Sequence, residues 1–121
     1  SKHKKSKLEK AEIKAKNFFD KWRTTGSYCP YFKEQVAVTR LLWDHLLNDR
    51  RRTKVEKIER LSLLPLAKKL LESTTTCQNH RPKGKFCFWA FHASLDGTNV
   101  KIVVSSKGIN KKKYLLSVMK Y

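Results

Sequence analysis

The sequence is poor in the residues that build disulfide scaffolds, acidic metal centres and membrane spans. Of its 121 residues only three are cysteines, an odd number without paired spacing, which argues against a disulfide framework and favours a reducing compartment. Only 10 residues are acidic, too few to favour the converging carboxylates of a two-metal nuclease centre. No apolar run approaches the roughly 20 residues that span a bilayer, so we expect no membrane insertion. Glycine-rich phosphate loops and the HExxH and GxSxG motifs are also missing.

Basic residues are what the chain has in excess. Lysine and arginine number 28, which gives a formal net charge of +18. A charge of this size indicates a polyanionic partner, which is RNA, DNA, an anionic membrane surface or an acidic protein. The hydrophobic fraction of 40% is enough to bury one modest core, and the length suits one domain.

The first half of the chain has the periodicity of helices. Residues 1 to 23 predict one amphipathic helix, whose lysine-rich face is either solvated or a basic strip along a phosphate backbone. Gly26 and Pro30 indicate a break over residues 24 to 36. Thr39 is the expected N-cap of a central helix, and the segment 53–56 has the pattern of a capping box. We therefore divide the single domain into a basic helix with its connector, 1–37, and a core, 38–121.

The second half changes to the period of strands. Residues 86 to 95 predict a strand, Asp96-Gly97 a hairpin turn, 100 to 104 a second strand and 114 to 119 a third. The prediction is an α+β domain in which N-terminal helices pack on one face of a small C-terminal antiparallel β-meander.

One stretch of the central helix combines a proton-transfer group with phosphate-sized positive charge. A histidine such as His45 can transfer protons, and Arg51 and Arg52 offer planar donor forks for a phosphate. His45 alone is more simply explained as a helix-surface residue, and arginines near a helix C-terminus also complement its dipole. Further candidate RNA contacts follow along the chain: Arg50, Lys101, Lys111, Lys112 and Lys113.

A metal site has weaker support. Cys77, His80, Cys87 and His92 could be drawn as zinc ligands, but only the first two have tight ligand spacing. Buried thiols that act as small hydrophobic groups explain the cysteines better, so we expect no metal and no cofactor.

The order of several short motifs resembles a known family. These motifs are Trp43-Asp44-His45, Arg50-Arg51-Arg52, Leu63-Leu64-Pro65, Phe88-Trp89-Ala90, Val100-Lys101-Ile102-Val103-Val104 and Leu116-Ser117-Val118. Together they resemble the phage and toxin nuclease domains of the barnase–EndoU–colicin–RelE-like superfamily. The resemblance implies metal-independent RNA cleavage, with His45, one of the arginines and Ser117 as site positions. His80 and His92 are the candidates for the second acid or base.

These observations lead to three functional hypotheses. The first is an endoribonuclease toxin or effector domain that cleaves RNA, tRNA among the candidates, by 2′-hydroxyl attack in the cytoplasm. His45 would be the general acid or base, Arg51 and Arg52 phosphate clamps, and Ser117 a transition-state donor. The second is a non-catalytic basic nucleic-acid-binding module. The third is a basic face that docks an acidic protein, and a toxin would also need such a partner as its immunity protein or antitoxin.

Overall fold

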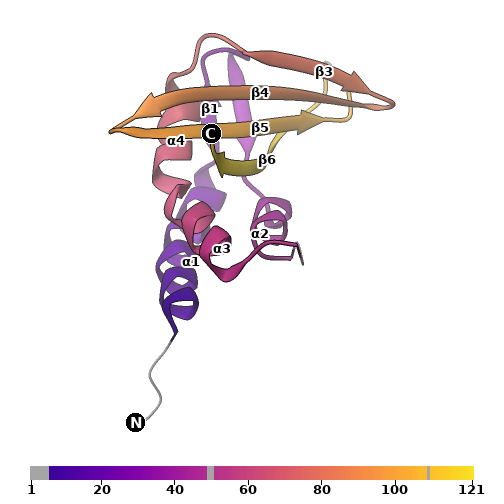
Figure 1. Ribbon diagram of the computed structural model, residues 1–121. Coiled ribbons are helices and arrows are strands. Elements are labelled where there is room, and N and C mark those ends of the chain that lie inside the picture. The colour runs from indigo at the N-terminus through magenta and orange to yellow at the C-terminus, as the bar shows by residue number, and fades with distance from the viewer. Residues whose placement is uncertain (1–5, 49–50, 109) are drawn as a thin grey trace.

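The described helices lie on one face of the β-sheet, and none of them covers the other face, called the open face below (Figure 1). The structure, a computed structural model, describes residues 6–48, 51–108 and 110–121, which form four helices and a six-stranded sheet. The predicted α+β class, with N-terminal helices against a C-terminal sheet, is confirmed. None of the helices in these ranges combines the length and the apolar character needed to traverse a bilayer.

Two of the four described helices begin at the caps that the sequence predicts. The four are α1 (Lys7–Thr25), α2 (Arg40–Leu47), α3 (Lys54–Ser62) and α4 (Leu64–Ser73). The hydroxyl of Thr39 accepts from Leu41 N, and that of Thr53 accepts from Glu56 N at 3.1 Å, so both predicted caps are confirmed. Pro65 stands at the start of α4, where a missing N–H costs nothing.

The sheet is larger than the predicted meander of three strands. Its members are β1 (Ser27–Cys29), β2 (Glu34–Ala37), β3 (Asn79–Lys83), β4 (Phe86–Leu95), β5 (Thr98–Ser106) and β6 (Lys113–Lys120), in the order β1-β2-β6-β5-β4-β3. All neighbours are antiparallel except β2 and β6, which are parallel. The break expected at residues 24–36 therefore holds two strands. β1 and β2 have only three and four residues, so their hydrophobic pattern is too short to identify them as strands. In addition, β2 pairs with β6, which lies far along the chain.

The predicted hairpin between β4 and β5 is confirmed. Leu95 pairs with Thr98, so Asp96 and Gly97 form a two-residue loop. Both have positive φ, 51° and 78°, as a type I′ turn requires.

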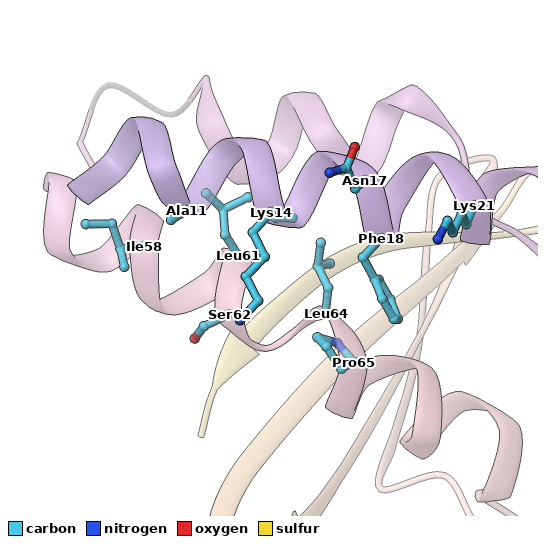
Figure 2. A pocket seen from close by; sticks show the side chains of 11 residues that line it. Ala11, Lys14, Asn17, Phe18, Lys21, Ile58, Leu61, Ser62, Leu64 and Pro65 are labelled. Carbon is cyan, nitrogen blue, oxygen red and sulfur yellow. The ribbon is translucent and has the colours of Figure 1, made fainter. Parts of the chain in front are cut away.

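The core fills the space between the helix layer and the covered face of the sheet. Helices contribute fully buried side chains such as Phe19, Leu42 and Leu71, and the sheet contributes Phe91 and Ile102. α1 packs along α3, and a groove remains between them and the start of α4 (Figure 2). Alternation along each strand means that residues neighbouring these core positions project from the open face.

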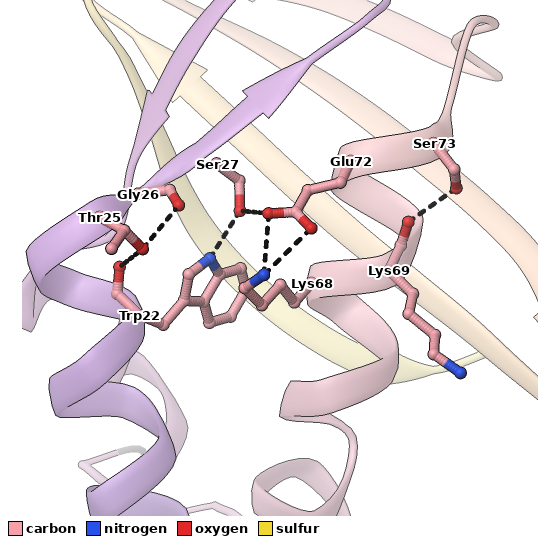
Figure 3. A network of polar contacts seen from close by, with 8 residues as sticks. All are labelled: Trp22, Thr25, Gly26, Ser27, Lys68, Lys69, Glu72 and Ser73. Atoms are coloured by element: carbon pink, nitrogen blue, oxygen red, sulfur yellow. Dashed lines mark hydrogen bonds and ion pairs between the residues drawn. The ribbon is translucent and has the colours of Figure 1, made fainter.

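A polar network ties α1, β1 and α4 together (Figure 3). The indole Nε1 of buried Trp22 donates to Ser27 Oγ at 2.7 Å, and this hydroxyl donates to Glu72 Oε2 at 2.7 Å. Lys68 Nζ completes the chain at 3.1 Å from Glu72 Oε1. The polar groups of the network are hydrogen-bonded to one another. The buried indole N–H of Trp22 therefore has an acceptor, which offsets the cost of removing it from water.

Replacing Ser27 with alanine is expected to lower the free energy of unfolding by about 1–3 kcal/mol, because the buried indole N–H loses its acceptor. Urea unfolding followed by circular dichroism measures the change. Ser73→Ala is the matched control. Its hydroxyl donates to the carbonyls of Lys69 and Leu70 in its own helix, and the residue is exposed, so a change within about 0.5 kcal/mol is expected. Equal losses in the two variants would contradict the role assigned to the network.

Candidate nucleic-acid interface

The open face of the sheet carries aromatic and basic side chains next to one another. Residues directly opposite in antiparallel strands point to the same face, so the strand register defines its rows. One row runs Arg81, Phe88, Ser105 and Tyr114 across β3, β4, β5 and β6. The next row along the strands runs Asn79, Ala90, Val103 and Ser117, and a third runs His92, Lys101 and Met119.

A shallow depression of about 320 Å³ lies over the β3, β4 and β5 part of this face. Its floor includes the ring of Phe88, and its cations are Arg81, Lys83 and Lys101. Phe86, next to Phe88 at 6.3 Å between ring centroids, has 45% of its surface exposed. A partly exposed aromatic floor with a cationic margin can stack a base and hold its phosphate at the same time.

His92 lies on this face, in the row that contains Lys101. It lies directly opposite Lys101 of β5 in the strand register. Its ring stacks on that of Tyr121, with 4.1 Å between the ring centroids. Its backbone N–H donates to Gln78 Oε1 at 3.0 Å, which holds β4 at this position. The ring is half-buried. His92 and Lys101 are thus cross-strand neighbours on one face, where an imidazole and a lysine could both reach a bound phosphate.

Ser117 projects from the same open face because it is the partner of Val103. It is only 6% exposed. Lys101 and Ser117 therefore share a face, one row apart.

His45 lies on the other side of the molecule. It belongs to α2, which packs against the covered face of β6, and the sheet separates it from Ser117. The imidazole is exposed and lines a shallow depression formed by its own helix, with Leu41, Asp44 and Asn48. The site predicted from His45, the arginines and Ser117 is thus not assembled around one groove.

One residue of the predicted arginine clamp, Arg52, has a structural role. The Arg52 guanidinium donates to the backbone carbonyl of His45, where it supplies a donor to the C-terminal end of α2. Arg51 is exposed. Arg50 lies outside the described residues.

The three consecutive lysines at 111–113 differ in exposure, and the last of them is the first residue of β6. Lys111 and Lys112 are exposed, but the Lys113 side chain is only 3% exposed. Its Nζ lies 3.3 Å from Glu34 Oε1 and 5.3 Å from the ring centroid of Phe32. The expected RNA contact of Lys113 is therefore corrected: β6 turns this side chain toward the core, where a carboxylate and aromatic rings hold it.

The zinc ligands considered from the sequence are not brought together. His80 projects to the covered face and stacks on Trp89 at 5.0 Å, whereas His92 projects to the open face. No three His, Cys, Asp or Glu side chains among the described residues are grouped for a metal ion. Cys29, Cys77 and Cys87 are free thiols. Burial raises the pKa of the Cys29 thiol, which keeps it protonated and apolar in character.

Sequence reasoning missed Arg81, Lys83 and Phe88 as members of a site, and it gave His92 no particular support. Alternation over residues 79–83 was the available signal, because Asn79, Arg81 and Lys83 all fall on one side of a strand. Pro82 and Gly84 obscured this strand pattern, because both residues are typical of turns. Only the register with β4 places these side chains around Phe88.

The fold and this face define an α+β domain with an uncovered, basic and aromatic sheet surface. Comparison of the chain with protein-family models, curated proteins and solved structures finds no match.

Proposed function

We propose that the protein binds single-stranded RNA on the open face of its sheet. The observation that carries the proposal is the ring of Phe88 lying among Arg81, Lys83 and Lys101 on a face that no described helix covers. Single-stranded bases have free π-faces to stack on such a ring, and the cations neutralise the backbone phosphates. The net charge of +18 adds long-range attraction.

The depression favours a single strand over a duplex. Stacked base pairs hide their π-faces, so a duplex would contact the cations and leave Phe88 unused. Splayed nucleotides of a loop or an unpaired end use both parts of the surface. We expect RNA loops, those of tRNA included, to bind more tightly than a perfect duplex of equal length.

Replacing Phe88 with leucine is expected to weaken binding of a single-stranded RNA oligonucleotide by about 1–3 kcal/mol, or roughly 5- to 150-fold, because the stacking surface is lost while an apolar side chain remains. Fluorescence anisotropy with a labelled oligonucleotide measures the affinity. Tyr28→Leu is the matched control. This exposed aromatic residue lies on the same face, but on β1 at the far edge of the sheet. Equal losses for Phe88 and Tyr28 would place the stacking elsewhere.

The second candidate function is metal-independent cleavage of the bound RNA. The observation that favours it is the pairing of His92 with Lys101 on the same face as Ser117. His92 would take the proton of a 2′-hydroxyl as that oxygen attacks the adjacent phosphorus. Lys101 would stabilise the charge that develops on the phosphate oxygens, and the departing 5′-oxygen would take a proton from the Tyr121 phenol or from water. The products are a 2′,3′-cyclic phosphate and a 5′-hydroxyl.

The resemblance to the barnase–EndoU–colicin–RelE-like superfamily stays a prediction, and so does a cytoplasmic site of action. If the superfamily prediction holds, the proposal here changes the residues that would do the chemistry. His92 takes the place of His45, Lys101 that of the arginine clamp, and Ser117 keeps its role as a donor.

A further inference from the structure

The helix layer contains an apolar groove of about 420 Å³ on the side of the molecule away from the open sheet face (Figure 2). It lies between α1 on one side and α3 with the start of α4 on the other. Its lining is mainly aliphatic and aromatic and includes Ala11, Ala15, Phe18, Ile58, Leu64 and Pro65. The RNA-binding proposal makes no use of this surface.

The apolar surface extends beyond the groove along α3. Val55 precedes Ile58 by three residues, so both lie on one stripe of that helix. Val55 is 73% exposed, although it is a large aliphatic residue. A contiguous apolar surface of this kind, left open in the monomer, is typical of an interaction site.

A row of lysines runs along the α1 edge of the groove. Lys7, Lys10, Lys14 and Lys21 fall within a sector of about 60° of that helix, given 100° per residue. All four are exposed, and Lys14 and Lys21 line the groove itself. In the described part of the chain none of the four forms an ion pair, whereas Lys16 on the same helix pairs with Asp20 at 3.4 Å. The groove therefore has an apolar floor and one positively charged margin.

We propose that this groove binds an amphipathic helix of a partner protein, with acidic residues on the side that meets the lysine row. The stretch of α1 from Ala11 to Lys21 is about 15 Å long, which matches three turns of a docked helix. Ala11 and Ala15 are small and one turn apart, so a helix backbone can approach closely between Phe18 and Ile58. A nucleic acid would satisfy the lysines but would leave the apolar floor exposed. The inference is independent of the proposed RNA binding.

The probe for this site is a labelled synthetic peptide of about 15 residues, with leucines at the i, i+3, i+4 and i+7 positions of one helix face and glutamates beside them. A peptide of the same composition with the leucines scrambled is its control. We expect saturable binding of the amphipathic peptide in the micromolar range, a gain of helical circular dichroism on binding, and at least about tenfold weaker binding of the scrambled peptide.

Two variants locate the peptide. Ala11→Trp fills the groove, and Lys14→Glu with Lys21→Glu reverses its charged margin; each is expected to weaken peptide binding at least about tenfold. Lys33→Glu with Lys107→Glu has the same net charge change at exposed positions outside the groove, and we expect an effect within about twofold. The circular dichroism spectrum and the affinity for single-stranded RNA should stay those of the unchanged protein in Ala11→Trp, which separates this test from that of the RNA-binding face.

Several results would overturn the proposal. Equal binding of both peptides would show attraction by charge alone. Undiminished binding to Ala11→Trp would place the peptide outside the groove. Self-association in sedimentation equilibrium that Ala11→Trp abolishes would make a second copy of the chain the occupant. Loss of RNA affinity on reversing Lys14 and Lys21, with peptide binding unchanged, would assign the lysine row to nucleic acid.

Discussion

Replacing Arg81, Lys83 and Lys101 together with alanine is expected to lower the affinity for single-stranded RNA by up to about 3 kcal/mol, or roughly a hundredfold, near 0.1 M salt. These cations surround Phe88 in the depression of the open face. Each exposed contact with a phosphate contributes up to about 1 kcal/mol. Three lost contacts should also reduce the slope of log affinity against log salt by about two, since each phosphate neutralised on a single strand contributes about 0.7.

The matched control for this variant removes the same charge from the helix side of the molecule. Lys7, Lys10 and Lys14 are exposed on α1, where alanine is also a good helix former. Their replacement lowers the net charge by the same amount, so the general attraction of the protein for RNA falls equally. If RNA binds on the open face, the slope of log affinity against log salt for this control stays close to that of the unchanged protein. A slope that falls equally in both variants would contradict a localised site.

Replacing His92 with alanine is expected to slow RNA cleavage about a hundredfold to ten-thousandfold, because the reaction loses the group that accepts the 2′-hydroxyl proton. Cleavage of an end-labelled RNA is followed on denaturing gels in the presence of EDTA, and the product ends are tested for a 2′,3′-cyclic phosphate. RNA affinity should change far less than the rate, because stacking on Phe88 and the contacts of Lys101 remain.

His45→Ala is the informative comparison for the cleavage experiment. His45 is an exposed imidazole on α2, on the opposite side of the sheet from Ser117. We expect this variant to cleave at the rate of the unchanged protein. Loss of cleavage in His45→Ala but not in His92→Ala would move the centre to the α2 surface. An unchanged protein that binds RNA and leaves it intact in EDTA would remove the cleavage function and leave the binding function standing.

The features that the sequence predicted well are those that neighbouring residues determine. The caps at Thr39 and Thr53 need only a hydroxyl and an N–H two or three residues further on. The turn at Asp96 and Gly97 needs two residues that tolerate positive φ between two strand-like segments. The α+β class follows from the change of hydrophobic period along the chain. The excess of basic residues predicts a polyanionic partner from composition alone, and that partner stays a prediction.

Only the tertiary structure determined which side chains share a surface, because strand register is a non-local property. A bulge between β5 and β6 lets Leu115 and Val118, three residues apart, both face the core, and it leaves Ser117 on the open face. Pairing of β6 with β2 turned Lys113 inward to Glu34. Pairing of β3 with β4 brought Arg81 to Phe88. The sequence alone determined the kinds of residue available, and the pairing of distant strands decided that His92, not His45, lies beside Lys101.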